Sequence, residues 1–252
     1  NGARKLRKDH PALPISPVEL GATAASSFDA GASMLHLHVR DKNQKHSLDP
    51  DLYGLATQEI KRQAGSELIV QITTESVGKY RPEEQIECVK RTKPEAVSLA
   101  LREIIPNDQY EATAARFFTW LHIEKIAPQW ILYDQEDIQL FRNYCVRGLI
   151  PDEIIHVLIV LGRHHKTNQS NPNELAGLVT LLNQNWHWSA CAFGKEETKC
   201  MERAIELNGH CRVGFENNLY LADGREAPSN TDLVLSTAEA IRSSGNSVAS
   251  CE

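Results

Sequence analysis

The sequence predicts an α/β protein built as a (β/α)8 TIM barrel, and three observations carry this prediction. Short apolar, β-branched runs alternate with helical patterns along the whole chain. The runs recur at intervals of roughly 30 residues, the size of one strand–helix unit. Several of them alternate apolar and polar residues, as a barrel strand does when it separates its two faces. The 252 residues fit one such domain, residues 1–252, and the alternative arrangement is an open doubly wound sheet.

Strands are predicted wherever a short run is rich in apolar and β-branched residues. The first two runs read MLHLHVRD and LIVQITTE, and later ones include IIHVLIVLG and RVGFENNLY. The predicted strands cover residues 34–41, 68–75, 96–102, 129–134, 154–162, 187–194 and 212–220.

Helices fill the intervals between these strands, and two of them have recognisable N-termini. Ser16 precedes Pro17 and stands three residues before Glu19, which predicts a capping box. Asp49 and Pro50 open the next helix in the same way. The remaining helices are predicted over residues 81–91, 108–124, 136–147, 173–183, 196–207 and 230–242.

This series begins with a helix, whereas a parallel strand–helix series normally begins with a strand. We therefore expect residues 1–4 to be the tail of a first strand that is largely missing from this chain. With that strand the count reaches eight, the number that closes a barrel.

The composition limits which kinds of partner the protein can bind and indicates its cellular compartment. The chain has 27 Lys and Arg against 33 Asp and Glu, a net charge of −6, which argues against nucleic-acid binding driven by bulk charge. No apolar run approaches the roughly 18 residues of a membrane span. The six cysteines show no CxxC spacing, which predicts free thiols in an intracellular, cytoplasmic protein.

A pair of histidines suggests a metal site in the second barrel strand. Leu35, Leu37 and Val39 share the face that should meet the helices, so His36 and His38 should point into the barrel. Two imidazoles at positions i and i+2 of one strand face can bind a single Zn²⁺. The alternative is a pair of hydrogen-bonded core histidines.

The last predicted strand supplies a third candidate ligand. Its polar face carries Arg212, Gly214, Glu216 and Asn218, and a buried Glu or Arg is costly unless it is paired or bound to a metal. Alternate strands contribute to the same layer of a barrel, so Glu216 should reach the two histidines. Two His and one carboxylate form a catalytic zinc set, whereas the alternative is a structural Arg–Glu pair.

Further polar residues end the predicted strands and should ring the same mouth of the barrel. Each alone would be an ordinary strand-end group, and Asp134 fits a helix cap. The loop of residues 162–165 adds positive charge, which could bind phosphate or simply be solvated. The remaining strand-end candidates are Gln71, Thr73, Glu75 and Glu103.

Several strings, taken together, resemble the β-keto acid cleavage enzymes, the family of 3-keto-5-aminohexanoate cleavage enzyme. They are NGAR, DHPALPISPVELG, GASMLHLHVRD with HSLD after it, QITTE, SLALRE and GHCRVGFENNLYL, and they extend over nearly the whole chain. The resemblance implies a zinc-dependent TIM barrel that converts a β-keto acid and acetyl-CoA into acetoacetate and a new acyl-CoA. It also implies a homo-oligomer.

The resemblance also implies roles for individual residues. It places the zinc ligands on His36, His38 and Glu216, and a catalytic arginine on Arg212. A hydroxyl residue of the third strand falls on Thr73, where the type enzyme has serine.

This sequence departs from the family pattern at two positions. Asn217 stands where the family commonly has an Asp that partners the arginine. Either Glu103 or Glu75 then acts as the base in its place, or the proton goes elsewhere. Arg4 stands where the type enzyme has a Glu that meets its substrate's ammonium group, which favours an anionic or neutral side group on the substrate. Arg4, Glu75 and Asn217 are thereby predicted to contact the substrate.

Two other functions are compatible with a polar barrel mouth. A zinc hydrolase of the amidohydrolase type also uses HxH, but it would need further ligands on the fifth and sixth strands and an Asp on the eighth. A barrel that binds a metal or an acyl-CoA without turnover is the second alternative, motivated by Asn217. The sequence contains no strand-linked GxGxxG and no GxxxxGK[ST], so dinucleotide and P-loop sites lack support.

Overall fold

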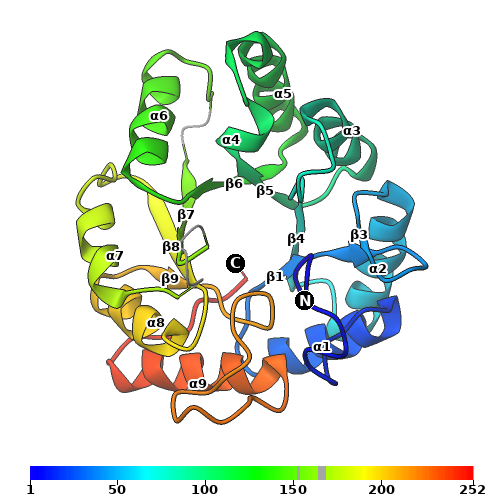
Figure 1. Cartoon of the computed structure of the whole chain (residues 1–252), viewed down its shortest axis with the longest axis vertical. Coiled ribbons are helices and arrows are strands. Elements are labelled where there is room, and N and C mark those ends of the chain that lie inside the picture. Colours follow the sequence, from blue (N-terminus) through cyan, green and yellow to red (C-terminus); the bar gives the residue numbers. More distant parts are fainter. Residues whose placement is uncertain (152–153, 164–168, 252) are drawn as a thin grey trace.

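The computed structural model describes residues 1–151, 154–163 and 169–251. In this part of the chain, parallel strands curl around a central axis and helices lie outside them (Figure 1), which confirms the predicted α/β class and barrel arrangement. In spatial order the main sheet contains β1 (Met34–Leu37), β4 (Ile69–Thr73), β5 (Ala96–Ala100), β6 (Ala127–Leu132), β7 (His156–Leu161), β8 (His187–Ala192) and β9 (His210–Cys211).

Most helices begin close to the residues where the sequence predicted them. Ser16 forms the expected capping box with Glu19, and Asp49 accepts a hydrogen bond from the Asp51 backbone. Among the described helices, none is both long and apolar enough to cross a membrane. The helical elements are α1 (Pro17–Asp29), α2 (Pro50–Ala64), α3 (Pro82–Thr92), α4 (Leu101–Ile104), η1 (Asp108–Tyr110), α5 (Glu111–Glu124), α6 (Gln135–Val146), α7 (Pro172–Val179), α8 (Glu197–Glu206) and α9 (Asn230–Ser243).

The strands pack their outer faces against the helices and keep a different set of side chains inside. Trp130 of β6 is fully buried, with its ring centroid 4.8 Å from Phe118 of α5 and 5.4 Å from Phe141 of α6. The period of two then turns the neighbouring residue Gln129 inward. An apolar part of the interior is formed by Leu158, Val160, Cys191 and Phe193.

The predicted eighth strand over residues 212–220 is wrong for most of its length. Pairing with β8 stops at β9, and the chain then turns, with the Asn217 and Asn218 amides donating to the Gly214 carbonyl. The Phe215 amide donates to the side chain of Asn230, the first residue of α9, at 2.8 Å, so its partner lies on a helix and not on a neighbouring strand. Val213 and Phe215 alternate with polar residues as in a strand, but here the alternation arises because both side chains pack into an apolar cluster beside a turn.

Two smaller elements also differ from the prediction. The second predicted strand, 34–41, is divided, because β2 (Val39–Arg40) leaves the sheet to pair antiparallel with β3 (His46–Ser47). The fourth predicted strand, 96–102, ends at Ala100, and α4 follows at once. Glu103 therefore lies on a short helix and not at the end of a strand.

Residues 1–5 bridge the two edges of the sheet instead of forming a strand. Asn1 donates to the His38 carbonyl at 3.2 Å, and Lys5 donates to the Glu216 carbonyl at 2.7 Å. The buried Arg40 guanidinium holds this segment by donating to the backbone carbonyls of Ala3 at 2.8 Å and of Lys5 at 3.0 Å.

Candidate metal centre and active site

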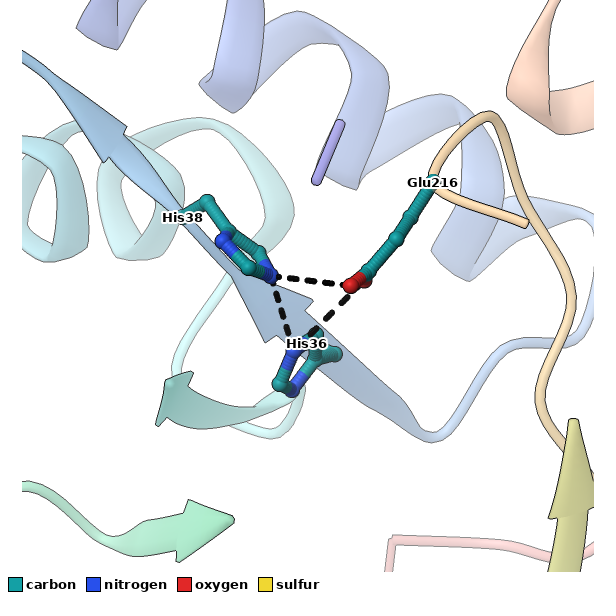
Figure 2. A group of neighbouring side chains, drawn as sticks. All are labelled: His36, His38 and Glu216. Carbon is teal, nitrogen blue, oxygen red and sulfur yellow. Dashed lines mark hydrogen bonds and ion pairs between the residues drawn. The ribbon is translucent and has the colours of Figure 1, made fainter. Parts of the chain in front are cut away.

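Three potential ligands converge at the C-terminal end of β1, as Figure 2 shows. His36 lies on β1, His38 follows it directly, and Glu216 reaches in from the turn after β9. The two Nε2 atoms lie 3.1 Å apart, and Glu216 carboxylate oxygens lie 3.2 Å from His38 Nε2 and 3.6 Å from His36 Nε2. The sequence predicted this grouping, although it placed Glu216 on a strand.

The local fold explains why these side chains meet. Leu37 is fully buried among helix-facing residues, so the period of two turns its neighbours inward. On the opposite side, Gly2 has a φ of +65° and packs against Glu216, where a Cβ would come within 2.8 Å of the glutamate Cγ. Only glycine fits there, and its close approach restricts where the carboxylate can lie.

The protonation states suit metal binding. Burial and the positive charge of Arg212 hold the pKa of His36 well below its usual value, so its imidazole is neutral. Burial opposes ionisation of Glu216, but His38 and Arg212 hold the pKa of Glu216 well below its usual range. A neutral imidazole and an ionised carboxylate are the forms that coordinate metals.

The spacing of the three groups also fits a metal ion. Atoms bound at about 2.0–2.1 Å in a tetrahedron lie about 3.3 Å apart, close to the 3.1, 3.2 and 3.6 Å observed here. Nitrogen and oxygen donors in this ratio are the set found in catalytic zinc centres that keep a position open for substrate. The residues present therefore fit a metal of this kind.

Arg212 adds a buried positive charge beside the carboxylate. Its Nη2 donates to Glu216 Oε2 at 2.9 Å, so the Arg–Glu pair and the His–His–Glu group share one carboxylate. Burial opposes the charged form, but Glu216 raises the pKa of Arg212, which stays protonated. Its Nη1 is buried and forms no hydrogen bond with any residue of the described chain. A buried donor of this kind is suited to a substrate oxygen.

A second cluster of charges surrounds Glu75 at the end of β4. Glu75 Oε1 accepts from Arg163 at 2.6 Å and from the more exposed Arg4 at 3.4 Å. The Arg163 guanidinium also lies over the Phe193 ring, 4.9 Å from its centroid. Two guanidiniums share one carboxylate, so this cluster has an excess of positive charge. The residues at positions 164 and 165 of the predicted basic loop lie outside the described residues.

Other predicted site residues lie near these two clusters without joining the group of three. Thr73 is buried, and its hydroxyl accepts the Glu75 backbone amide at 3.0 Å. Glu103 accepts from the Ser76 amide and hydroxyl, and burial raises its pKa. Asn217 is buried, and its side chain interacts with the Cys191 thiol. Asp134 caps α6 as predicted.

Three supporting residues were not among the predicted site residues. His46 is buried beside His38 and contacts the Glu75 carbonyl at 2.9 Å, and burial lowers its pKa to about 3. Arg40 holds the first residues in place. Glu197 accepts hydrogen bonds from Asn218 at 3.1 Å and from the Gly214 backbone, and burial raises its pKa to about 8. The sequence signal for His46 was the HSLD string, whereas nothing local distinguished Glu197.

Comparison with known proteins gives these residues a family. The model of the beta-keto acid cleavage enzyme family matches residues 1–252. The chain is 27% identical over 255 residues to a 3-keto-5-aminohexanoate cleavage enzyme of Acetoanaerobium sticklandii, covering 98% of this chain and 91% of the relative. It is also 27% identical over 258 residues to a 3-oxoadipate:acetyl-CoA acetyltransferase of Cupriavidus necator, covering 98% and 88%.

Solved structures support the fold independently. A type I 3-dehydroquinate dehydratase from Clostridium difficile superposes with a TM-score of 0.58 and 11% identity, covering 87% of each chain. A 3-dehydroquinate dehydratase from Enterococcus faecalis superposes with a TM-score of 0.54 and 12% identity, covering 79% of this chain and 84% of the other. At this identity the likeness concerns the fold alone. The family match over the full 252 residues is decisive, and the chain belongs to the beta-keto acid cleavage enzyme family.

Proposed function

We propose that this chain is a zinc-dependent enzyme that converts a β-keto acid and acetyl-CoA into acetoacetate and a new acyl-CoA. The C2–C3 bond of the β-keto acid breaks. Its acyl group, which begins at C3, passes to CoA, and its C1–C2 unit joins the acetyl group to form acetoacetate. No oxidation or reduction occurs, so no redox cofactor is needed. The observation that carries the proposal is the largely buried His–His–Glu group with Arg212 beside it. The names of the relatives support the same chemistry. We further propose a cytoplasmic homo-oligomer, in keeping with the free cysteines.

His36, His38 and Glu216 would hold the zinc ion. Bound there, Zn²⁺ would act as a Lewis acid toward the oxygens of the β-keto acid and favour loss of a proton from its C2 carbon. The protein contributes a neutral His36 and an ionised Glu216 at neutral pH, so neither ligand must lose a proton before binding.

Arg212 is assigned to binding negative charge on the substrate. Glu216 occupies one of its terminal nitrogens and leaves Nη1 with no partner among the described residues. A fixed guanidinium in a buried site stabilises developing oxyanions more strongly than it would in water. Asn217 cannot accept the proton that a carboxylate would, so its neutral amide is assigned to substrate binding.

Glu103 is assigned to proton transfer. Burial raises its pKa, which brings a carboxylate nearer to the working range of a general base. Ser76 fixes its orientation with two hydrogen bonds. Thr73 orders the end of β4, and its hydroxyl is assigned to the reaction centre. Glu75 is already paired with two arginines and is assigned to the substrate-binding rim.

The charge of that rim favours an anionic or neutral side group on the substrate. Arg4 is 61% exposed in its side chain, so it can reach a group outside the buried centre. Arg163 lies on the other side of Glu75 and adds a second positive charge. A cationic side group would meet repulsion from both.

The reaction itself is tested by its products. The zinc-loaded chain, given acetyl-CoA and β-keto acids with anionic, neutral or cationic side groups, should form acetoacetate and a matching new acyl-CoA. Because the metal is required, a strong chelator should abolish both products, and zinc should restore them. Mass spectrometry of the acyl-CoA pool measures the outcome. Zinc-loaded protein that is inactive on the whole panel would instead favour a binding protein without turnover.

The role of Arg212 is tested by Arg212→Lys, which keeps the charge but not the two-nitrogen fork. We expect kcat/KM to fall by about 10²–10³-fold, the usual effect of removing a transition-state donor. Zinc content should be measured in parallel, so that loss of metal is not mistaken for loss of catalysis. The exposed Arg116→Lys on α5 is the matched control. A fall of less than threefold in Arg212→Lys would exclude the assigned role.

The side-group preference is tested by Arg4→Glu. The ratio of kcat/KM for an anionic over a cationic β-keto acid should fall about tenfold, a modest change because the side chain is exposed to solvent. Lys8→Glu makes the same charge change at a nearby exposed position and should leave the ratio unaltered. Wild-type protein that prefers the cationic substrate would contradict the assignment.

A further inference from the structure

A row of polar side chains crosses the inside of the barrel behind His36. The His36 Nδ1 atom lies 2.7 Å from Gln71 Oε1 on β4. Gln71 Nε2 donates to Gln129 Oε1 on β6 at 3.2 Å, and Gln129 Nε2 donates to Ser189 Oγ on β8 at 3.3 Å. The row therefore joins four inward-facing side chains in series, and only the first is a candidate metal ligand.

The strand register explains this arrangement. His36 pairs with Gln71 between β1 and β4, and β4, β6 and β8 are alternate strands of the sheet. Alternate strands supply one layer of a barrel interior, and that layer is usually filled by branched apolar side chains. Gln71 is only 1% exposed, so its amide is costly at this place unless both ends are satisfied.

The direction in which hydrogen bonds are donated along this row determines the tautomer of His36. Because Gln71 presents its oxygen, the His36 Nδ1 must carry the proton, and the neutral ring then has its lone pair on Nε2. That Nε2 is the atom that faces His38 and Glu216. If both glutamine amides were reversed, Gln71 would present its NH2 group, and the His36 proton would move to Nε2, which could no longer bind a metal.

We propose that Gln71, Gln129 and Ser189 form a positioning row that keeps His36 in the tautomer able to bind metal. Gln71 acts directly on the imidazole. Gln129 favours the observed orientation of the Gln71 amide by accepting a hydrogen bond from its Nε2, and Ser189 accepts one from Gln129 in turn. Groups that orient a ligand histidine in this way commonly affect metal affinity by 10–100-fold. This inference rests on the proposed zinc site, but it does not require that the site be catalytic.

The first test measures zinc affinity of the full chain by competition with a chromophoric chelator. Gln71→Met removes the acceptor at similar volume and should weaken zinc binding about 10–100-fold. Gln71→Glu still offers an oxygen to His36, and Gln129 can reverse to donate to it, so its affinity should stay within about threefold of wild type. Gln129→Met, which does not touch His36, should weaken binding by an intermediate factor.

A matched control separates this effect from a general loss of stability. Gln85 on α3 is also fully buried and donates to the Tyr80 carbonyl, but it lies outside the barrel interior. Gln85→Met should lower the thermal midpoint to an extent comparable with Gln71→Met and leave zinc affinity unchanged. Equal losses of zinc affinity in the two variants would overturn the proposal.

The second test reads the tautomer without metal. Two-bond ¹H–¹⁵N spectra of zinc-free protein labelled in histidine should show the Nδ1–H form of His36 in wild type and in Gln71→Glu. A mixture with the Nε2–H form is expected in Gln71→Met. A wild-type chain that bound no zinc would overturn the zinc site alone, since this spectrum still tests the row. Nε2–H as the main form in wild type would overturn the row.

Discussion

The structure depends on the burial of one ionised carboxylate inside the barrel. Glu216 lies with its side chain 15% exposed, and an isolated charge in such surroundings is strongly unfavourable. Arg212 at 2.9 Å offsets one charge, and the two imidazoles occupy the other side of the carboxylate. Removing Arg212 would leave the carboxylate charge without its ion-pair partner, which is far more costly than losing the pair as a whole.

This constraint explains why two differently built elements meet at the site. The histidines come from a parallel strand whose register fixes their direction, and Gln71 fixes the tautomer of His36. The carboxylate comes from a turn, which needs anchors on all sides. Asn230 accepts the Phe215 amide, Glu197 holds both ends of the turn, and the first residues of the chain close over it. The positions of the two histidines are thus set by the pleat of the strand, and the position of Glu216 is set by the hydrogen bonds that anchor its turn.

Local patterns in the sequence were sufficient for part of this architecture. The period of two in the second predicted strand, 34–41, correctly turned His36 and His38 inward, and cap residues located most helix starts. The same period correctly predicted that Glu216 lies near the histidines, but it wrongly predicted a strand there. In a turn whose apolar side chains, such as Phe215, are buried, apolar and polar residues can alternate as they do in a strand. The partners of Arg40 and Glu197 could not be predicted, since they lie far away in the sequence and no local periodicity records them.

We propose that two histidines and one glutamate, and none of the six cysteines, hold a zinc ion in this chain. X-ray absorption at the zinc edge of the zinc-loaded protein tests it most directly. We predict that the zinc ion is surrounded by nitrogen and oxygen atoms at about 2.0–2.1 Å, two of them from imidazoles. This coordination shell should be lost in Glu216→Gln. A shell containing sulfur at about 2.3 Å, or an unchanged spectrum in that variant, would contradict the account.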